Sequence, residues 1–207
     1  MPKLPKQVWL GHQSTVESIK WDPKGFLLAS SAADDSQILV WSPKSRQHIL
    51  SLNDHSGAIR DFKWSNIDPK AASSYNQGGV GFIVTLSMDQ SIKLYDIARN
   101  KAECLMTLKH PQHIGSLSLS PDNSLLAVGG QNQDIYIWSL KDQKLIRSFY
   151  NPVSNEEVTS SEFDANSKAV FDINWSSDGT VVAAGFQKSV VMIDMKKLFA
   201  SQTDIGS

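Results

Sequence analysis

The chain has 207 residues, and its hydrophobic content of 41%, with six Trp and eight Phe, is ample for a packed core and excludes a globally disordered protein. Its 20 Lys and Arg nearly balance its 21 Asp and Glu, and a net charge of -1 argues against direct binding of nucleic acid through a basic face. The longest apolar runs have the length of strands, far below the roughly 20 residues of a membrane helix, so no membrane partner is expected.

Two short apolar runs, about twenty residues apart, occur together four times along the chain. Apolar and polar residues alternate within them, which is typical of strands with one buried face, and helical periodicity is nearly absent. The first runs end at Trp21, Trp64, Leu119 and Trp175, and the second runs end at Trp41, Tyr95, Trp138 and Ile193. A spacing of about 40 to 45 residues between equivalent runs indicates a repeat protein. The sequence therefore predicts an all-β fold.

The first repeat, residues 11–52, predicts four strands, and Asp22-Pro-Lys-Gly25 supplies the turn between the first two. Its strands are expected at residues 16–21, 26–31, 37–41 and 48–52. The second repeat, residues 54–108, predicts strands at 58–64, 82–86, 91–95 and 103–108. An inserted polar loop is expected at residues 65–81 of this repeat.

The third repeat, residues 109–150, predicts strands at 113–118, 125–129, 135–138 and 145–150. The fourth repeat, residues 169–198, predicts only three strands, at 170–175, 181–184 and 190–193. One more strand is expected at residues 7–10, and residues 201–207 are expected to be a tail. Residues 1–200 are thus predicted to form a single array of sixteen strands.

A repeat of this length, with Gly-His near its start and an aromatic residue followed by Asp or Ser near its end, resembles the WD-repeat β-propeller family. The resemblance implies four blades, and two arrangements of them are open. If residues 7–10 pair with the fourth repeat, the blades close into a ring without exposed sheet edges. Otherwise the chain forms a partial or half propeller, whose open blade edges favour self-association.

The WD resemblance also implies a buried hydrogen-bond network in each blade. In such a blade a His bonds an Asp in the turn before the third strand, and a Ser or Thr links this His to the aromatic residue of the third strand. The members are His12, Ser31, Asp35 and Trp41 in the first repeat, and His55, Thr85, Asp89 and Tyr95 in the second. The third and fourth repeats lack a full set, with Asn132 and Gln187 in the place of the Asp.

Position within the repeat predicts which residues bind a partner. The residue after the first apolar anchor of each innermost strand is expected to look into the mouth of the central channel, and the residue before each turn Asp or its equivalent faces the same rim. The two sets are Glu17, Arg60, Gly115 and Phe171, and Asp34, Met88, Gln131 and Phe186. Aromatic anchors beside opposed charges resemble a peptide-binding hot spot, and the alternative is a set of solvated loop residues.

No catalytic, cofactor or metal site is predicted. His110 and His113 have the spacing of two metal ligands, but no cluster of Cys, Asp or Glu follows at ligand spacing. The Gly-rich residues 78–81 lack the Lys and the Ser or Thr of a phosphate-binding loop, and no nucleophile lies at a recognisable interval from a base. We therefore expect a protein that is not an enzyme and that binds no cofactor.

Residues 11–30, residues 59–65 with the insertion after them, and residues 170–176 carry a closer resemblance. They are similar to the last four repeats of the transducin β-like proteins, which are subunits of nuclear-receptor corepressor complexes that contain a histone deacetylase. The resemblance implies a scaffold in transcription regulation that binds corepressor or deacetylase subunits and histone or transcription-factor tails. The LisH segment, the F-box-like stretch and the first half of the propeller in that family have no counterpart in the sequence, which implies a fragment or a diverged paralogue.

The same features bear on where the protein acts. Residues 1–6 contain two prolines and no apolar stretch, so no signal peptide is expected, and the single cysteine, Cys104, cannot form an internal disulfide. The resemblance favours the nucleus, with the cytoplasm as the alternative. In the alternative the chain is an adaptor in a cytoplasmic complex or the substrate-recognition subunit of a ubiquitin ligase.

Overall fold

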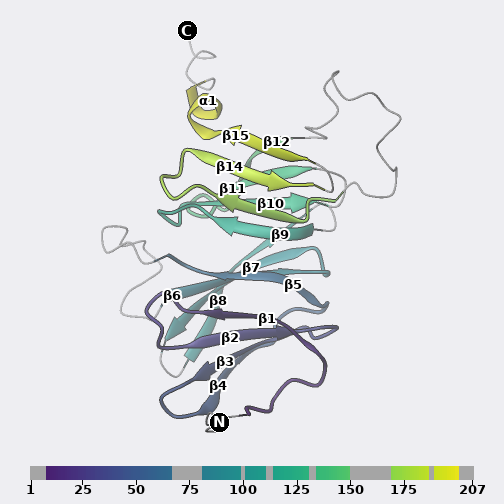
Figure 1. Cartoon of the computed structure of the whole chain (residues 1–207), viewed down its shortest axis with the longest axis vertical. Helices are drawn as coiled ribbons and strands as arrows, with labels where there is room; N and C mark the ends of the chain where they lie inside the picture. Colours follow the sequence, from purple (N-terminus) through teal and green to yellow (C-terminus); the bar gives the residue numbers. More distant parts are fainter. Residues whose placement is uncertain are drawn as a thin grey trace, which may run out of the picture.

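Four antiparallel sheets follow one another along the chain (Figure 1). The computed structural model describes residues 8–66, 81–98, 101–110, 114–130, 134–149, 169–186 and 189–200. In each sheet the strands lie side by side in chain order, four in each of the first three sheets and three in the fourth. This arrangement confirms the all-β prediction and the four blades of a β-propeller, which we number 1 to 4 in chain order.

The strands of blade 1 are β1 (Val16–Trp21), β2 (Leu28–Ala32), β3 (Ile38–Ser42) and β4 (Gln47–Leu52). Those of blade 2 are β5 (Ile59–Trp64), β6 (Gly81–Ser87), β7 (Ser91–Ala98) and β8 (Lys101–Lys109). Those of blade 3 are β9 (Ile114–Leu119), β10 (Leu125–Gly130), β11 (Ile135–Ser139) and β12 (Lys144–Phe149). Blade 4 contains β13 (Asp172–Trp175), β14 (Val181–Gly185) and β15 (Val190–Asp194), followed by a short helix, α1 (Met195–Ala200). Within the described ranges no helix has the length and apolar character that crossing a membrane requires.

The turn between the first two strands uses related chemistry in blades 1, 3 and 4. The Asp22 carboxylate accepts a hydrogen bond from the amide of Leu27, and Gly25 adopts a left-handed φ of 71°, which glycine tolerates because it has no Cβ. Gly179 has the same φ in blade 4, and Asn123 takes this place in blade 3 with φ 60°. Because the turn holds Leu27, β2 begins after it and not at residue 26 as predicted.

Most of the core lies between neighbouring blades. Across the boundary of blades 1 and 2, Ala29 and Val40 of blade 1 share a buried apolar cluster with Phe62, Trp64 and Ile83 of blade 2. Alternate residues of a strand point to opposite faces of its sheet, so one strand supplies side chains to two boundaries. Each internal blade is therefore buried on both faces, and the repeats stabilise one another in sequence.

The four blades form an open arc. In Figure 1 blade 1 lies at one end of the stack and blade 4 at the other, with blades 2 and 3 between them. Residues 8–10 form no strand, and Trp9 stacks on Trp41 of blade 1 with ring centroids 5.9 Å apart. The prediction that residues 7–10 close the ring as a sixteenth strand is therefore wrong over its described part, because this stacking holds the segment on blade 1. The alternative prediction, a half propeller, describes the arrangement.

Candidate partner-binding site

A chain of hydrogen bonds crosses blade 1 from a buried Trp to a turn. The indole N–H of Trp41 donates to Oγ of Ser30, and this hydroxyl donates to Nε2 of His12, both at 2.7 Å. Nδ1 of His12 then donates to the Asp35 carboxylate at 2.9 Å. With a proton on Nδ1, His12 donates to Asp35 and accepts from Ser30, so every member of the network has a partner. The network fastens the segment before β1 to the second and third strands of the blade.

The hydroxyl in this network belongs to Ser30, so the prediction of Ser31 is wrong. Leu28 pairs with Trp41 between β2 and β3, and residues two apart on a strand share a face, so Ser30 lies on the Trp41 side. Ser31 points to the opposite face of the sheet. The spacing between the hydroxyl residue and the turn Asp indicated the wrong serine, because the turn that leads to Asp35 is one residue longer in blade 1 than in blade 2.

We expect Ser30→Ala to lower the free energy of unfolding by about 1 to 3 kcal/mol, because it leaves the Trp41 indole and one nitrogen of His12 without their partner. Ser31→Ala removes a buried hydroxyl of the same size and should cost clearly less. Urea-unfolding midpoints of the two variants, followed by circular dichroism, measure the difference. A larger loss in Ser31→Ala would contradict the register described above.

Blade 2 holds the same kind of network around His55. Nδ1 of His55 donates to Asp89 at 2.8 Å, and Nε2 accepts from the Thr85 hydroxyl at 2.7 Å. Burial lowers the pKa of His55, although Asp89 opposes this, so the imidazole is neutral near pH 7. Burial alone would raise the pKa of Asp89, but hydrogen bonds from Ser91, His55 and the amide of Ser56 lower it to about 2.

Blades 1 and 2 differ at the aromatic residue of the third strand, which is hydrogen-bonded to the network in blade 1. Tyr95 of blade 2 is buried, no hydrogen bond joins its hydroxyl to Thr85, and burial raises the pKa of that hydroxyl. In blade 3 the buried ring of His110 packs edge-on against Tyr136, with centroids 4.5 Å apart. The predicted Asn132 and Gln187 lie outside the described residues.

The innermost strands of blades 1 to 3 each begin with a bulge at the position predicted to face the channel. The pairing skips Glu17 between β1 and β2, Arg60 between β5 and β6, and Gly115 between β9 and β10. A bulge leaves the extra residue outside the ladder and re-aims its side chain. All three residues are exposed. Phe171, directly before β13, holds the equivalent place in blade 4 and is 62% exposed.

The second predicted set lies in the turns between the second and third strands. Asp34 is exposed and adopts a left-handed φ of 54°. Met88 is half-buried, and its amide donates to the carbonyl of Ala58 at 2.9 Å, which ties the turn to the start of the innermost strand. Gln131 lies outside the described residues. Asp34 and Met88 are therefore available beside the bulges of blades 1 and 2.

Phe186 does not line the channel mouth, so its prediction is wrong. It is 8% exposed and belongs to the apolar cluster between blades 3 and 4. Val182 and Ala184 of β14 are in the same cluster, and the alternation of the strand places Phe186 on their face. The aromatic side chain thus contributes to the core of blade 4.

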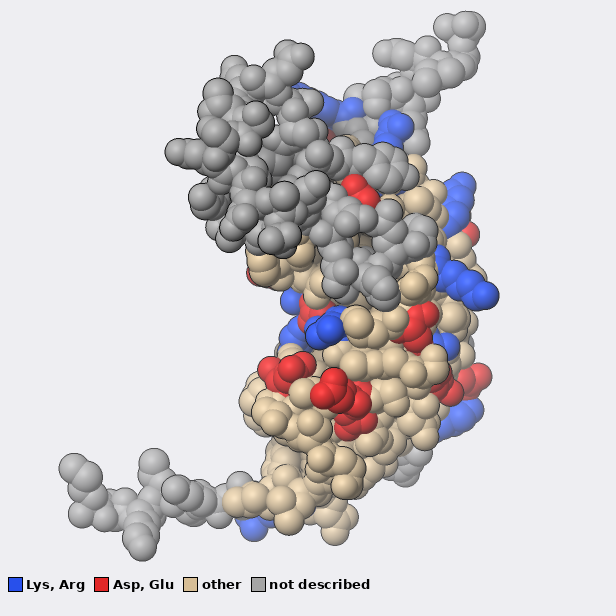
Figure 2. Space-filling model, turned by 90° about the vertical axis from the view of Figure 1, so that its right-hand side faces the viewer, with Lys and Arg blue, Asp and Glu red and all other residues tan. Residues whose placement is uncertain are grey.

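Charged and polar groups link the innermost strands of three blades. Nζ of Lys20 on β1 donates to the Asp61 carboxylate and to the Phe62 carbonyl on β5. Asp61 also accepts from the amide of Leu117 on β9 at 3.1 Å. Burial lowers the pKa of Lys20, although Asp61 opposes this. Figure 2 views the side on which the innermost strands begin and shows acidic and basic side chains gathered at the middle of the arc.

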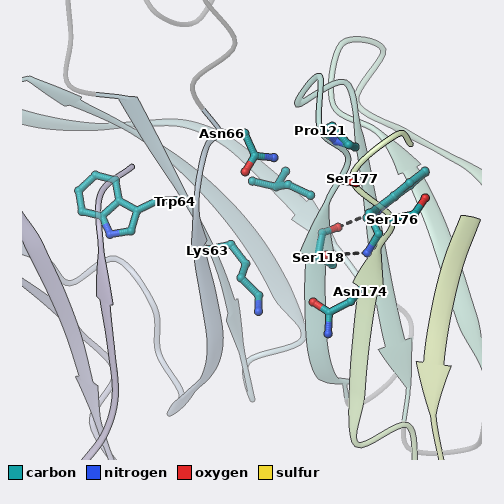
Figure 3. Close-up of a pocket in the computed structure, with 10 residues that line it drawn as sticks. Lys63, Trp64, Asn66, Ser118, Pro121, Asn174, Ser176 and Ser177 are labelled. Carbon is teal, nitrogen blue, oxygen red and sulfur yellow. Dashed lines mark hydrogen bonds between the residues drawn. The ribbon is translucent and has the colours of Figure 1, made fainter. Parts of the chain in front are cut away.

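A cavity of about 390 Å³ opens where the innermost strands end (Figure 3). Its walls include Lys63 and Trp64 of β5, Ser118 of β9, and Asn174 and Trp175 of β13. Each Trp indole donates to a backbone carbonyl of the preceding blade, at 3.0 Å for Trp64 and 3.1 Å for Trp175. Sequence reasoning missed this cavity, because a Trp at the end of an innermost strand is equally typical of a buried blade boundary.

In the parts of the chain that the structure describes, no group of three or more His, Cys, Asp or Glu could hold a metal ion. His113, one of the two His at ligand spacing, lies outside those parts.

The family model described as "WD domain, G-beta repeat" matches residues 3–42, 102–139 and 157–194, which is more than half of the chain. The second match spans the outermost strand of blade 2 and the first three strands of blade 3. The repeat of the sequence is therefore offset from the blade of the structure by one strand.

The curated relatives are distant. A ribosome biogenesis protein WDR12 homolog from Drosophila yakuba is 22% identical, over 100% of this chain and 47% of the relative. The WD40 repeat-containing protein HOS15 from Arabidopsis thaliana is 28% identical, over 93% of this chain and 28% of the relative. Eukaryotic translation initiation factor 3 subunit I from Lodderomyces elongisporus is 24% identical, over 88% of this chain and 48% of the relative. The chain spans about half the length of these relatives or less.

Proposed function

Because the chain belongs to the WD-repeat family, we propose that it is a non-catalytic scaffold that binds a peptide segment of a partner protein along the face where its innermost strands begin. One observation carries the proposal: four equivalent positions of the repeat, occupied by Glu17, Arg60, Gly115 and Phe171, are exposed on that face. Bulges direct the first three out of the ladder, so the face is built by the fold and its chemistry is set by the residue in each blade.

The residues on this face suit an extended peptide with basic side chains. Glu17 and Asp34 supply acidic groups in blade 1, and exposed Phe171 supplies an aromatic anchor in blade 4. Arg60 and Met88 of blade 2 lie between them and contribute one basic and one apolar group. Gly115 adds no side chain to this face in blade 3, because a Cβ at this position would lie only 2.9 Å from the carbonyl oxygen of Val170. A histone or transcription-factor tail rich in Lys and Arg has the matching charge.

We expect the double variant Glu17→Lys and Phe171→Ala to weaken binding of a labelled, Arg- and Lys-containing histone-tail peptide at least about tenfold, because it removes an acidic contact and the aromatic anchor. Fluorescence anisotropy at two salt concentrations measures the dissociation constant, and the wild type should bind more weakly at the higher one.

Glu103→Lys is the matched control, since it makes the same charge change at an exposed position on the outermost strand β8. It should leave the affinity for the peptide near that of the wild type. Equal affinity in the double variant and the wild type would show that this face does not bind the peptide.

The more specific function that we propose is a transducin β-like subunit of a histone deacetylase corepressor complex in the nucleus. Its support is the resemblance of residues 11–30, 59–65 and 170–176 to the last four repeats of that family. Affinity purification from nuclear extract followed by mass spectrometry tests it. Recovery of deacetylase and corepressor subunits is the expected result, and their absence would overturn this assignment while leaving the scaffold proposal to the peptide experiment.

A second candidate function is a subunit of a complex in ribosome assembly. The observation that favours it is the WDR12 homolog, whose alignment extends over the whole chain. Pre-ribosomal proteins in the same purification would support it. Recovery of cullin-type ligase components would favour the ubiquitin-ligase alternative.

A further inference from the structure

Blade 1 exposes a face that blades 2 and 3 bury. We call the face that a blade turns to the blade before it its front face. The register between the first two strands makes Ile19 and Trp21 of blade 1 equivalent to Phe62 and Trp64 of blade 2. Phe62 is 0% exposed and Trp64 is 6% exposed, whereas Ile19 is 62% exposed and Trp21 is 54% exposed. The front face of blade 1 has the composition of an internal boundary, but no other blade in the described parts of the chain packs on it.

Blade 4 has the complementary feature at the other end of the arc. We call the face that a blade turns to the blade after it its back face. Val190 and Met192 on β15 are equivalent to Ile38 and Val40 of blade 1, which are both 0% exposed against blade 2. Val190 is 68% exposed and Met192 is 65% exposed. The apolar side chains of this back face therefore meet solvent.

The two faces also carry matching hydrogen-bonding groups. At two internal boundaries, the indole N–H of the Trp that ends an innermost strand donates to a backbone carbonyl on the innermost strand of the blade before it. The acceptor is the next-to-last residue of that strand, Lys20 for Trp64 and Ser118 for Trp175. In the register of the repeat the exposed Trp21 is the equivalent donor, and Asn174 of blade 4 holds the equivalent carbonyl. The front of blade 1 and the back of blade 4 thus fit each other as the internal boundaries do.

We propose that the back face of blade 4 packs on the front face of blade 1 of a second copy of this chain, and that two such contacts close a ring of eight blades. A second copy fits these two faces because this chain already presents both halves of the boundary, with the indole donor at one end and the carbonyl acceptor at the other. The contact joins different faces, so it closes a ring if the rotation per blade is suitable. Eight blades lie within the range of known propellers.

The N-terminal segment leaves the proposed contact open. Trp9 stacks on Trp41, and a Cβ on Gly11 would lie 2.7 Å from the Trp41 ring, so this segment covers the outer part of the front face. Ile19 and Trp21 lie nearer the channel and stay exposed. A second copy therefore needs no rearrangement of the described residues to reach them.

The mass of the 207-residue chain in solution, measured by sedimentation velocity and light scattering, tests the proposal. The wild type is expected to be a dimer. Trp21→Glu on the front face and Met192→Glu on the back face should each give a monomer, because every contact then contains one charged face. Both positions are exposed in the single copy, so circular dichroism should show an unchanged fold. Leu105→Glu, an exposed apolar position on β8, is the control that should stay dimeric.

Mixing the two monomeric variants separates head-to-tail contact from other arrangements. Trp21→Glu keeps an intact back face and Met192→Glu keeps an intact front face, so an equimolar mixture should recover a dimer through one intact contact. A wild type that is monomeric at every concentration overturns the proposal, as does a Met192→Glu variant that dimerises alone through paired front faces. Open chains that lengthen with concentration would show that the ring does not close.

Discussion

Phe62→Ala is expected to lower the free energy of unfolding by about 3 to 5 kcal/mol, the typical loss for truncating a buried Phe. Phe62 is fully buried in the cluster between blades 1 and 2, where its ring packs beside Trp64 and Ile83. The loss combines the transfer free energy of the missing ring atoms with the cavity that the rigid sheets cannot fill. Urea unfolding at a protein concentration low enough for a monomer measures this effect.

Ile19→Ala is the matched control, because Ile19 occupies the same position of the repeat in blade 1 but is mostly exposed. In the monomer its truncation should change the free energy of unfolding by less than about 0.5 kcal/mol. Similar losses in the two variants would contradict the arrangement of blade 1 at the end of the arc, since they require the front face of blade 1 to be buried within a single copy.

Asp89→Ala is expected to lower the free energy of unfolding by about 3 kcal/mol, at the upper end for loss of a buried hydrogen-bonding partner. The carboxylate accepts hydrogen bonds from His55, from the amide of Ser56, and from both the amide and the hydroxyl of Ser91. Asp89→Asn keeps one acceptor oxygen and should lose less. The sequence further predicts a smaller loss for Asn132→Ala in blade 3, and equal shifts in the urea midpoint of Asp89→Ala and Asn132→Ala would contradict it.

The pH dependence of stability reports the same carboxylate. The pKa of Asp89 falls from 3.8 to about 2 in the fold, so the unfolded chain takes up the proton first as the pH is lowered. The stability contributed by this ionisation is complete above about pH 4 and is lost as the pH falls towards 2. The difference in unfolding free energy between wild type and Asp89→Ala should therefore shrink over that window. A difference that stays constant from pH 5 to 2 would mean that Asp89 is not held by these hydrogen bonds.

The strands and their order could be predicted from the sequence because they depend on local patterns. Alternation of apolar and polar residues marks each strand, and turns such as Asp22 to Gly25 separate them, so blades 1 to 4 were expected close to where they lie. The equivalence of Glu17, Arg60 and Gly115 was also accessible, because the repeat places each one directly after the first apolar residue of an innermost strand.

The other features of the fold and of the site depended on contacts between elements. Such contacts are set by the face of a sheet that a residue occupies and by what lies opposite that face. Because one turn has an extra residue, the hydroxyl of the network belongs to Ser30 and not to Ser31. The alternation of β14 continues to Phe186 and places its side chain in the boundary of blades 3 and 4. Stacking of Trp9 on Trp41 kept the N-terminal segment on blade 1 and left the arc open. Trp21 and Trp64 stand at the same position of the repeat, yet one is exposed and the other buried, since burial is set by the presence of a neighbouring blade and not by the residue itself.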